Sequence, residues 1–216
     1  MTKIGLIGCG MWGRNLARNL AQLNVLAAVA DRHDGNAAEF AEQFNSQKRD
    51  FDAILADPSI DGVVIATPAT SHDKLAVDAL NAGKHVYVEK PLSLTLAGAR
   101  SIANAAKKAG RQVMVGHLIL YHAAFCELQA QVNAGVIGRL RHIQANRLAM
   151  GRIRNTESVL FDLCPHDLSL ILALVDGLPN KIHCAGSSHM TVGVVDYLSS
   201  FLGFENGLSA GMQTSW

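Results

Sequence analysis

This sequence has almost no excess of charge of either sign, few aromatic side chains and no long apolar run. Its 19 Lys and Arg residues nearly balance 18 Asp and Glu residues, for a net charge of +1, and only 6% of the chain is aromatic. Without a basic run interleaved with aromatic residues, binding to nucleic acid is not expected. No apolar run approaches the roughly 18 residues that a membrane-spanning helix needs, so a membrane is not an expected partner either.

Cysteine is also sparse, and no C-x-x-C pair is present. Widely separated cysteines favour buried free thiols over a disulfide or a metal site, so we expect no metal. The first methionine leads straight into an apolar strand pattern, which argues against a signal peptide and for a cytoplasmic location. The four cysteines are Cys9, Cys126, Cys164 and Cys184.

Hydrophobic residues, in contrast, make up 49% of the 216 residues and glycine occurs 19 times. A chain of this length and composition can bury a large core as one large or two small domains.

The first motif combines a strand with a glycine-rich turn. Ile4–Ile7 is a short apolar run, and the spacing Gly8-x-Gly10-x-x-Gly13 follows it directly. In a dinucleotide-binding unit the first glycine makes the tight turn, the second lets a pyrophosphate approach the backbone, and the third lets the helix pack on the strand. Apolar residues then recur at helical spacing at Trp12, Leu16, Leu20 and Leu23.

An acidic residue at the end of the next strand supports this interpretation. The strand predicted at Val25–Ala30 is followed by Asp31, eighteen residues after Gly13. The expected distance to the carboxylate that binds a ribose hydroxyl is about 20 residues. A carboxylate there favours NAD, although Arg32 could stack on the adenine or reach a 2′-phosphate, so NADP stays possible.

Strands and helices continue to alternate as far as residue 115. We predict a capping box at Thr70-x-x-Asp73, opening a helix that ends at Gly83. This alternation is typical of an α/β fold with a doubly wound parallel sheet, which binds ligands at the carboxyl ends of its strands. The other predicted helices cover 35–45, 51–56 and 95–109, and the other strands 62–66, 85–88 and 112–115.

Several segments come directly after these strands and so should surround one crevice. One of these residues, Lys90, could instead be an ordinary solvated loop residue, because a lysine between an acid and a proline commonly is. The cofactor-binding residues predicted in this way are Gly8, Cys9, Gly10, Met11, Trp12, Gly13, Asp31, Arg32, Ala66, Thr67, Pro68, Glu89 and Lys90.

The runs Val64–His72 and Ala82–Leu92 resemble the Gfo/Idh/MocA family of NAD(P)-dependent sugar and inositol oxidoreductases. Among its members, those acting on nucleotide-linked sugars are the most similar around Asn146–Leu148 and Gly151–Arg154. The resemblance adds His72 to the cofactor-binding residues. It continues through Val115–His117, Gly135–Leu140 and Phe161–Asp167.

The resemblance implies two domains. Residues 1–117 would form the NAD(P)-binding Rossmann domain and residues 118–216 an α+β domain with an open, mainly antiparallel sheet. That sheet would supply a wall of the substrate site and the interface of a homo-oligomer.

The resemblance also implies three catalytic residues, Lys90, Asp162 and His166. Oxidation of a secondary alcohol releases a hydride to the nicotinamide and a proton to a base, and a histidine, with a pKa near 6.5, suits the proton transfer. Asp162 lies four residues before His166, so on one helix the carboxylate would orient the ring. Alternatively, Asp162 only caps that helix. Pro165 suits the first turn of a helix, so the helix would start at Asp162 or Cys164 rather than contain them.

Three arginines, Arg147, Arg152 and Arg154, suit an anionic sugar or a sugar nucleotide, because a guanidinium binds carboxylate or phosphate with a planar set of donors. They equally suit a solvated face of a sheet. A small polyol substrate and a non-catalytic regulator, such as the galactose-pathway repressor of yeasts in this family, remain alternatives. Further predicted substrate contacts are Lys90, His117, Tyr121 and His166.

The last residues, 207–216, alternate as a strand does and stop on Trp216, whereas related proteins continue beyond such a position. We therefore expect an incomplete second domain with an open sheet edge, shielded by a second subunit. The alternative is a compact short variant. The residues expected to lack cover are Leu198, Phe201, Leu202, Phe204 and Leu208.

Overall fold

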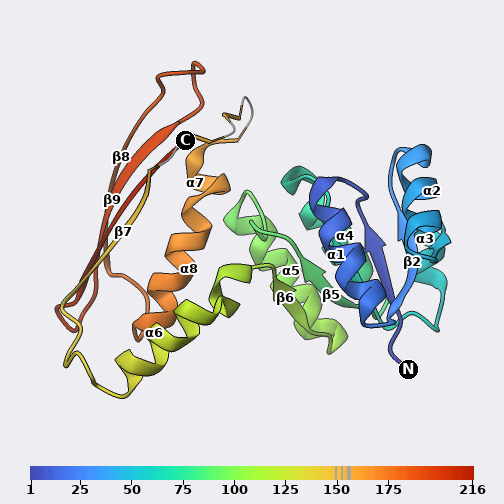
Figure 1. The fold of residues 1–216 in the computed structure, drawn as a ribbon, viewed down its shortest axis with the longest axis horizontal. Helices are drawn as coiled ribbons and strands as arrows, with labels where there is room; N and C mark the ends of the chain where they lie inside the picture. Colours follow the sequence, from blue (N-terminus) through green and yellow to red (C-terminus); the bar gives the residue numbers. More distant parts are fainter. Residues whose placement is uncertain (149, 152, 155–156) are drawn as a thin grey trace. The chain divides into compact units, whose positions relative to one another are not determined.

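A computed structural model describes residues 1–148, 150–151, 153–154 and 157–216 (Figure 1). The chain divides into two compact units, Met1–Gly116 and His117–Trp216. Each unit has its own sheet and its own hydrophobic core. Within the described parts of the chain, no helix is both long enough and apolar enough to cross a membrane.

The first unit is a doubly wound parallel sheet, as predicted. Its six strands follow the order β3-β2-β1-β4-β5-β6, and every pair is parallel. The strands are β1 (Ile4–Ile7), β2 (Leu26–Ala30), β3 (Gln47–Lys48), β4 (Gly62–Ile65), β5 (His85–Val88) and β6 (Val113–Val115). The helices are α1 (Met11–Gln22), α2 (Asp34–Gln43), α3 (Phe51–Ala56), α4 (His72–Asn81) and α5 (Leu96–Ala109), with the 3₁₀ turn η1 (Ala69–Ser71).

Neighbouring residues of one strand enter two different cores, because side chains alternate across a sheet. Leu6 packs with Ala17 of α1 and Phe40 of α2 on one face. Ile7 packs on the other face, in the core that Leu80 of α4 and Ile102 of α5 complete. Both faces of the sheet are therefore covered, which explains why the strands are continuous apolar runs.

One local prediction is wrong, and one short strand was not predicted. Thr70 lies inside η1, and α4 begins at His72 with no side-chain cap, so the predicted capping box is wrong. The two-residue strand β3 has exposed polar side chains, so no apolar pattern in the sequence predicts it. By contrast, Thr95 does cap α5, because its Oγ1 accepts a hydrogen bond from the N–H of Gly98 at 3.0 Å.

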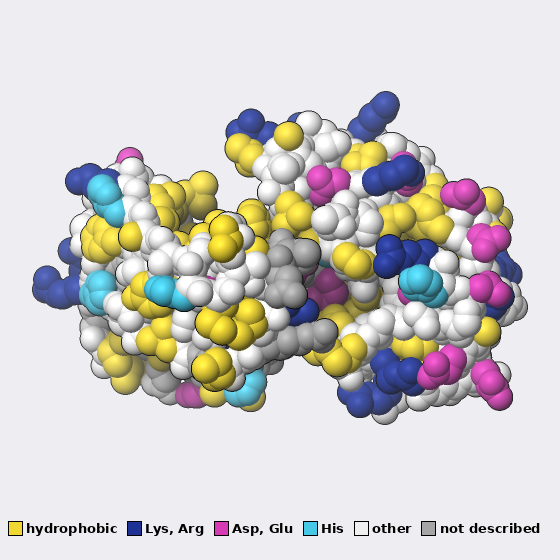
Figure 2. Space-filling model, turned by 90° about the horizontal axis from the view of Figure 1, so that it is seen from above, with side chains coloured by type: hydrophobic (Ala, Val, Ile, Leu, Met, Phe, Trp, Pro, Cys, Tyr) yellow, Lys and Arg dark blue, Asp and Glu magenta, His cyan; other side chains and the backbone are white. Residues whose placement is uncertain are grey.

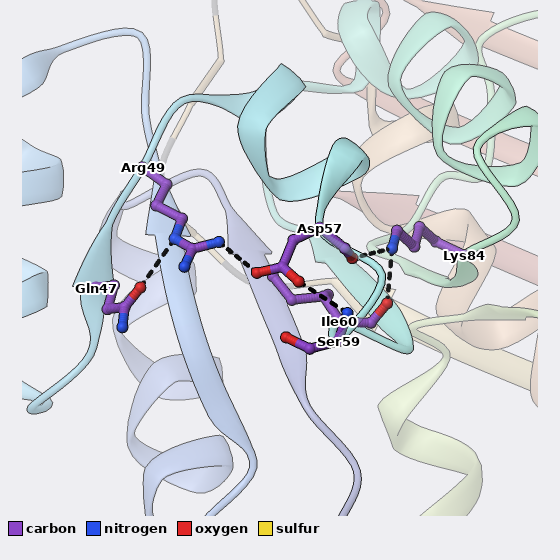
Figure 3. A network of polar contacts seen from close by, with 6 residues as sticks. All are labelled: Gln47, Arg49, Asp57, Ser59, Ile60 and Lys84. Atoms are coloured by element: carbon purple, nitrogen blue, oxygen red, sulfur yellow. Dashed lines mark hydrogen bonds and ion pairs between the residues drawn. The ribbon is translucent and has the colours of Figure 1, made fainter.

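A buried lysine holds the segment before β4, as Figure 3 shows. The Nζ of Lys84, a residue 4% exposed, donates to the carbonyl oxygens of Asp57 (2.5 Å) and Ile60 (2.8 Å). Hydrogen bonds from Ser59, together with Arg49 beside it, hold the pKa of the Asp57 carboxyl well below its usual range. This network fixes the segment that leads from α3 into β4.

The second unit has a four-stranded mixed sheet in the order β7-β10-β9-β8. β10 pairs with β7 in parallel and with β9 antiparallel, and β8 pairs antiparallel with β9. Its strands are β7 (His142–Leu148), β8 (Lys181–Ser187), β9 (Tyr197–Gly203) and β10 (Ser209–Ser215). Its helices are η2 (Leu118–Tyr121), α6 (Ala123–Asn133), α7 (Val159–Asp162) and α8 (Cys164–Leu174).

One face of this sheet is covered within the unit, contrary to expectation. Ile171 of α8 packs into a core with residues of β9, β10 and the turn between them, and α7 contributes Val159 next to it. The last strand, β10, lies inside the sheet between β7 and β9 rather than at its edge. Of the five residues expected to lack cover, Phe201 is 43% exposed, whereas Leu198, Leu202, Phe204 and Leu208 are buried.

Candidate functional site

The glycine turn after β1 has the geometry that a phosphate needs. Gly8 has φ +101°, and a Cβ on it would lie 2.7 Å from the Ala66 carbonyl. A Cβ on Gly13 would lie 2.1 Å from the Gly8 oxygen, so these two positions require glycine. A Cβ on Gly10 would meet nothing within 4 Å, which leaves the backbone open to a ligand. α1 begins at Met11, and its first-turn N–H groups have no acceptor within the helix.

Asp31 is fixed at the end of β2 by two backbone donors. Its Oδ2 accepts from the N–H of Cys9 at 2.7 Å, and its Oδ1 accepts from the N–H of His33 at 2.8 Å. Each carboxylate oxygen has a further lone pair, which a ribose hydroxyl can use. The exposed Arg32 donates from Nε to the Nε2 of His33 at 3.2 Å. The glycine turn and Asp31 thus fit an NAD molecule, whose ribose hydroxyl would bind to the Asp31 carboxylate.

The side chains of the glycine turn differ in exposure. Met11 is 78% and Trp12 42% exposed, so both present apolar surface beside the turn. Cys9 is buried. Its burial, and to a smaller extent the negative charge of Asp31, raise the pKa of its thiol to about 12. Its backbone N–H, rather than its sulfur, therefore takes part in the site.

The segment after β4 forms a closed loop. The Ser71 hydroxyl lies 2.7 Å from Thr67 Oγ1 and 2.8 Å from the Pro68 carbonyl oxygen. His72 is 1% exposed, with Nε2 2.9 Å from the Thr67 carbonyl oxygen and Nδ1 2.8 Å from that of Pro91. The ring of His72, one of the predicted cofactor-binding residues, is thus enclosed between two backbone oxygens.

Lys90 follows β5 between two fixed neighbours. Glu89 is 7% exposed, and its Oε1 accepts from the Tyr87 hydroxyl at 2.9 Å. The Lys90–Pro91 peptide is cis, and Lys90 itself is half-buried. Because β1, β2, β4 and β5 are parallel neighbours, the turn after β1, Asp31, Thr67 and Lys90 all lie at one edge of the sheet.

In the second unit, Asp162 and His166 lie on different helices. α7 ends at Asp162, α8 begins at Cys164, and Pro165 occupies the first turn of α8. The helix start at Cys164 agrees with the one predicted from Pro165, so Asp162 and His166 do not share one continuous helix. The N-cap residue of α8 is Leu163, so the alternative interpretation of Asp162 as its cap is wrong.

The carboxylate of Asp162 has partners that are distant in the sequence. Its Oδ2 accepts from Trp216 Nε1 at 3.2 Å and lies 3.4 Å from Arg154 Nε. Trp216 also lines a cavity of about 280 Å³ whose wall includes Met150, Ile153 and His189. Of the predicted arginine cluster, Arg154 thus approaches Asp162, whose partner Trp216 lines an open cavity.

Arg147, one of the three predicted substrate-binding arginines, has an acidic partner within its own unit. Its Nε and Nη2 donate to the two carboxylate oxygens of Asp167 at 3.0 and 2.7 Å, and Asp167 is 5% exposed. The guanidinium is thus paired with a buried carboxylate instead of lying on a solvated face. Arg152 lies outside the described residues.

The remaining predicted contacts lie around η2. His117 precedes η2 and is half-buried, and Tyr121 is 68% exposed. A polar pair that the sequence analysis missed lies on the segment between β8 and β9. There the buried Asp196 accepts from the backbone N–H of His189 at 2.6 Å and lies 2.9 Å from its Nδ1. Only the short separation of a histidine and an acid in a turn could have suggested this pair.

Comparison with known proteins agrees with this geometry. Residues 2–117 match the Gfo/Idh/MocA oxidoreductase family with an NAD-binding Rossmann fold, and residues 125–216 match the C-terminal domain of the same family. The chain belongs to this family, and its first unit is the NAD-binding domain.

Two individual relatives show which enzymes the chain is similar to. The chain is 32% identical, over 99% of its length, to a UDP-N-acetylglucosamine 3-dehydrogenase of Acidithiobacillus ferrooxidans. It is 33% identical, over 81% of its length, to an inositol 2-dehydrogenase of Acidothermus cellulolyticus. It covers 66% and 53% of the lengths of these two relatives.

Solved structures show the same fold. A structure of the UDP-N-acetylglucosamine 3-dehydrogenase from Acidithiobacillus ferrooxidans matches with a TM-score of 0.89 at 31% identity, covering 99% of this chain and 66% of that one. A protein from gentamicin A biosynthesis, solved in complex with NAD, matches with a TM-score of 0.92 at 23% identity, covering 100% of this chain and 66% of that one, and shows the fold alone.

Proposed function

We propose that this protein is a dehydrogenase that transfers a hydride from a secondary alcohol of a sugar, sugar nucleotide or polyol to NAD. The observation that carries the proposal is the phosphate turn at Gly8–Gly13, with Asp31 fixed beside it and Lys90 at the same edge of the sheet. When bound, NAD supplies the hydride acceptor. The two relatives named above, a dehydrogenase of a sugar nucleotide and a dehydrogenase of inositol, support this class of substrate.

The chain's own residues would handle the proton and the charge. His166 accepts the hydroxyl proton, because a neutral imidazole is an efficient base near neutral pH. The ammonium of Lys90 stabilises the negative charge that develops on the alcohol oxygen. Asp162, which lies beside Arg154 and accepts from Trp216 of the cavity wall, contributes to substrate binding in the second unit.

A panel assay tests this function. The protein is mixed with NAD or NADP and with inositols, sugars and sugar nucleotides, and NADH formation is followed by absorbance. Turnover of one substrate class by the wild-type protein supports the proposal. NAD binding measured by calorimetry without turnover of any of these substrates would instead support a regulator.

We also propose that the protein forms a homo-oligomer through its C-terminal sheet. β7 and β8 are the edge strands of the sheet. Apolar side chains on the sheet are exposed, among them Leu148 (51% exposed), Ile182 (60%) and Phe201 (43%). Figure 2 shows such side chains, in yellow, on the surface of the second unit. An exposed edge with apolar surface favours association.

Sedimentation at micromolar concentration tests the oligomer. We expect Phe201→Glu to shift the protein to monomers, whereas Leu178→Glu, at a 77% exposed position outside the strands, leaves the association unchanged. A monomeric wild-type protein would refute this proposal.

All four cysteines are free, and we propose a reducing, cytoplasmic location on that basis.

A further inference from the structure

His72 is the most enclosed polar side chain near the predicted cofactor-binding edge. Its relative exposure is 1%, yet both nitrogens of its ring lie within hydrogen-bonding distance of backbone oxygens. These oxygens belong to two loops that follow neighbouring parallel strands, β4 and β5. The ring therefore joins the two loops from inside the unit.

On one side, the ring closes the loop after β4. Its Nε2 lies 2.9 Å from the carbonyl oxygen of Thr67, five residues earlier. Ser71 reinforces this closure, because its backbone N–H donates to the Pro68 carbonyl oxygen at 3.0 Å and its hydroxyl lies 2.7 Å from Thr67 Oγ1. The path of the loop is thus fixed before α4 begins.

On the other side, the ring holds the loop after β5. Its Nδ1 lies 2.8 Å from the carbonyl oxygen of Pro91, the residue that follows Lys90. The residue before Lys90 is fixed as well, because the backbone N–H of Glu89 donates to the Ile65 carbonyl oxygen at 3.0 Å and its side chain is buried. The half-buried Lys90 therefore has a fixed neighbour on each side along the chain.

The chemistry of these contacts makes histidine hard to replace. Carbonyl oxygens only accept hydrogen bonds, and a histidine ring carries its two nitrogens in two different directions, with an N–H on one of them when the ring is neutral and on both when it is protonated. Glutamine carries its N–H groups on one nitrogen and would turn its own oxygen toward the second carbonyl. A smaller side chain would leave both carbonyl oxygens buried without a donor, which is unfavourable.

We propose that His72 is a positioning residue for Lys90: it ties the peptide after the lysine to the Thr67 loop and so keeps the ammonium at the cofactor-binding edge. The role of Lys90 in charge stabilisation comes from the proposed function, on which this inference rests. The tie itself does not depend on that function, so the two can fail separately.

The first test measures the position of Lys90 without using activity. Wild-type protein, His72→Gln and His72→Asn are treated briefly with an amine-acylating reagent, and modification of each lysine is measured by mass spectrometry. We expect Lys90 to react severalfold faster in both variants. Lys84, which is buried and bonded to two carbonyl oxygens, should react slowly throughout and thus report on unfolding of the unit.

The matched control is His85→Gln, at the opposite end of β5, where the ring accepts from the N–H of Gln112 at 3.1 Å. It should leave the acylation rate of Lys90 unchanged. Unchanged Lys90 reactivity in the His72 variants would overturn the inference, and so would a parallel rise at Lys84 in both, because the effect would then be general unfolding.

The second test is a double-mutant cycle in the dehydrogenase assay. His72→Gln should lower kcat by about 10- to 100-fold, since a displacement near 1 Å can have this effect. In a Lys90→Met background the same substitution should change kcat little, because the group that it positions is already absent. Additive effects would overturn the inference. If the wild-type protein turns over no substrate, the proposed function fails and the acylation result decides on His72 alone.

Discussion

The carboxylate of Asp31 is held in place by two backbone N–H groups before any ligand binds. We therefore expect Asp31→Ala to weaken NAD binding by about 10- to 100-fold, the value of a hydrogen bond to a charged group. NADP binding should weaken less or improve, because the charge that repels a 2′-phosphate is removed.

Calorimetry with both cofactors measures this change in preference. Asp34→Ala serves as the control, since Asp34 is an exposed acid only three residues further along the chain and pairs with Lys48. Equal affinities of the wild-type protein for NAD and NADP would contradict the assignment of Asp31 as the selecting residue.

His166 is the residue on which the proposed proton transfer depends. His166→Ala should lower turnover by about 10²- to 10⁴-fold, because removal of a general base has effects of this size. Affinity for NAD should hardly change, because the phosphate turn and Asp31 lie in the other unit. The exposed His183 provides the control variant, His183→Ala. Wild-type turnover in His166→Ala would exclude this role.

The cysteines should separate into two classes of reactivity. Burial raises the pKa of the Cys9 thiol to about 12, and burial also raises the pKa of Cys164, so both stay protonated at pH 8. Cys126 and Cys184 are exposed. Iodoacetamide at pH 8 should label the exposed pair first, because the thiolate is the reactive form. Peptide mapping by mass spectrometry would show the order, and early labelling of Cys9 would contradict it.

The raised pKa of Cys9 also has a consequence for stability. The folded state retains a proton that the unfolded chain releases above its ordinary value of 9.0. The free energy of unfolding should therefore be unaffected by this group below about pH 9 and fall between about pH 9 and 12. Comparison of wild type with Cys9→Ala by urea unfolding at several pH values isolates this contribution. The same pH slope in both proteins would contradict it.

Among the elements, α3 and β4 are joined by a segment that depends on Lys84 (Figure 3). Lys84→Met removes the donor of two buried carbonyl oxygens and should lower the free energy of unfolding by about 1–3 kcal/mol for each. Lys74→Met is the control, because Lys74 is an exposed partner of Asp78 and such pairs contribute at most about 1 kcal/mol. Chemical denaturation measures both, and equal losses would contradict the assignment.

The interruption between α7 and α8 shows how an element boundary changes a functional prediction. A spacing of four residues places Asp162 and His166 on one helix face only if the helix is continuous. Pro165 lacks a backbone N–H and suits a first turn, so α8 starts at Cys164 and Asp162 ends the preceding helix. The proline was visible in the sequence, but the partners of Asp162 were not.

At the level of the whole molecule, the first unit carries its own complete core. Both hydrophobic clusters of the doubly wound sheet consist of residues from Met1–Gly116. We expect a fragment of residues 1–116 to fold and to bind NAD without the second unit. NAD at 100 times its dissociation constant should stabilise the fragment by about 2.7 kcal/mol. Circular dichroism with thermal unfolding measures both properties, and an unfolded fragment would contradict the expectation.

The sequence by itself determined the alternation of strands and helices, the phosphate turn and Asp31. These features are local in the sequence, because apolar runs define buried strands and the three glycines follow one another within a single turn, although Gly8 is required by its approach to Ala66. The family resemblance also rested on continuous motifs, and the matching of both domains confirms it.

Only the tertiary structure decided the partners of the charged groups and the place of the last strand. Arg147 finds Asp167 twenty residues away, Asp162 finds Trp216 fifty-four residues away, and His72 reaches Pro91 nineteen residues on. β10 lies between β7 and β9, although only β9 is close in sequence. Such pairings depend on which surfaces the packed elements bring together, and no local pattern of residue types encodes them.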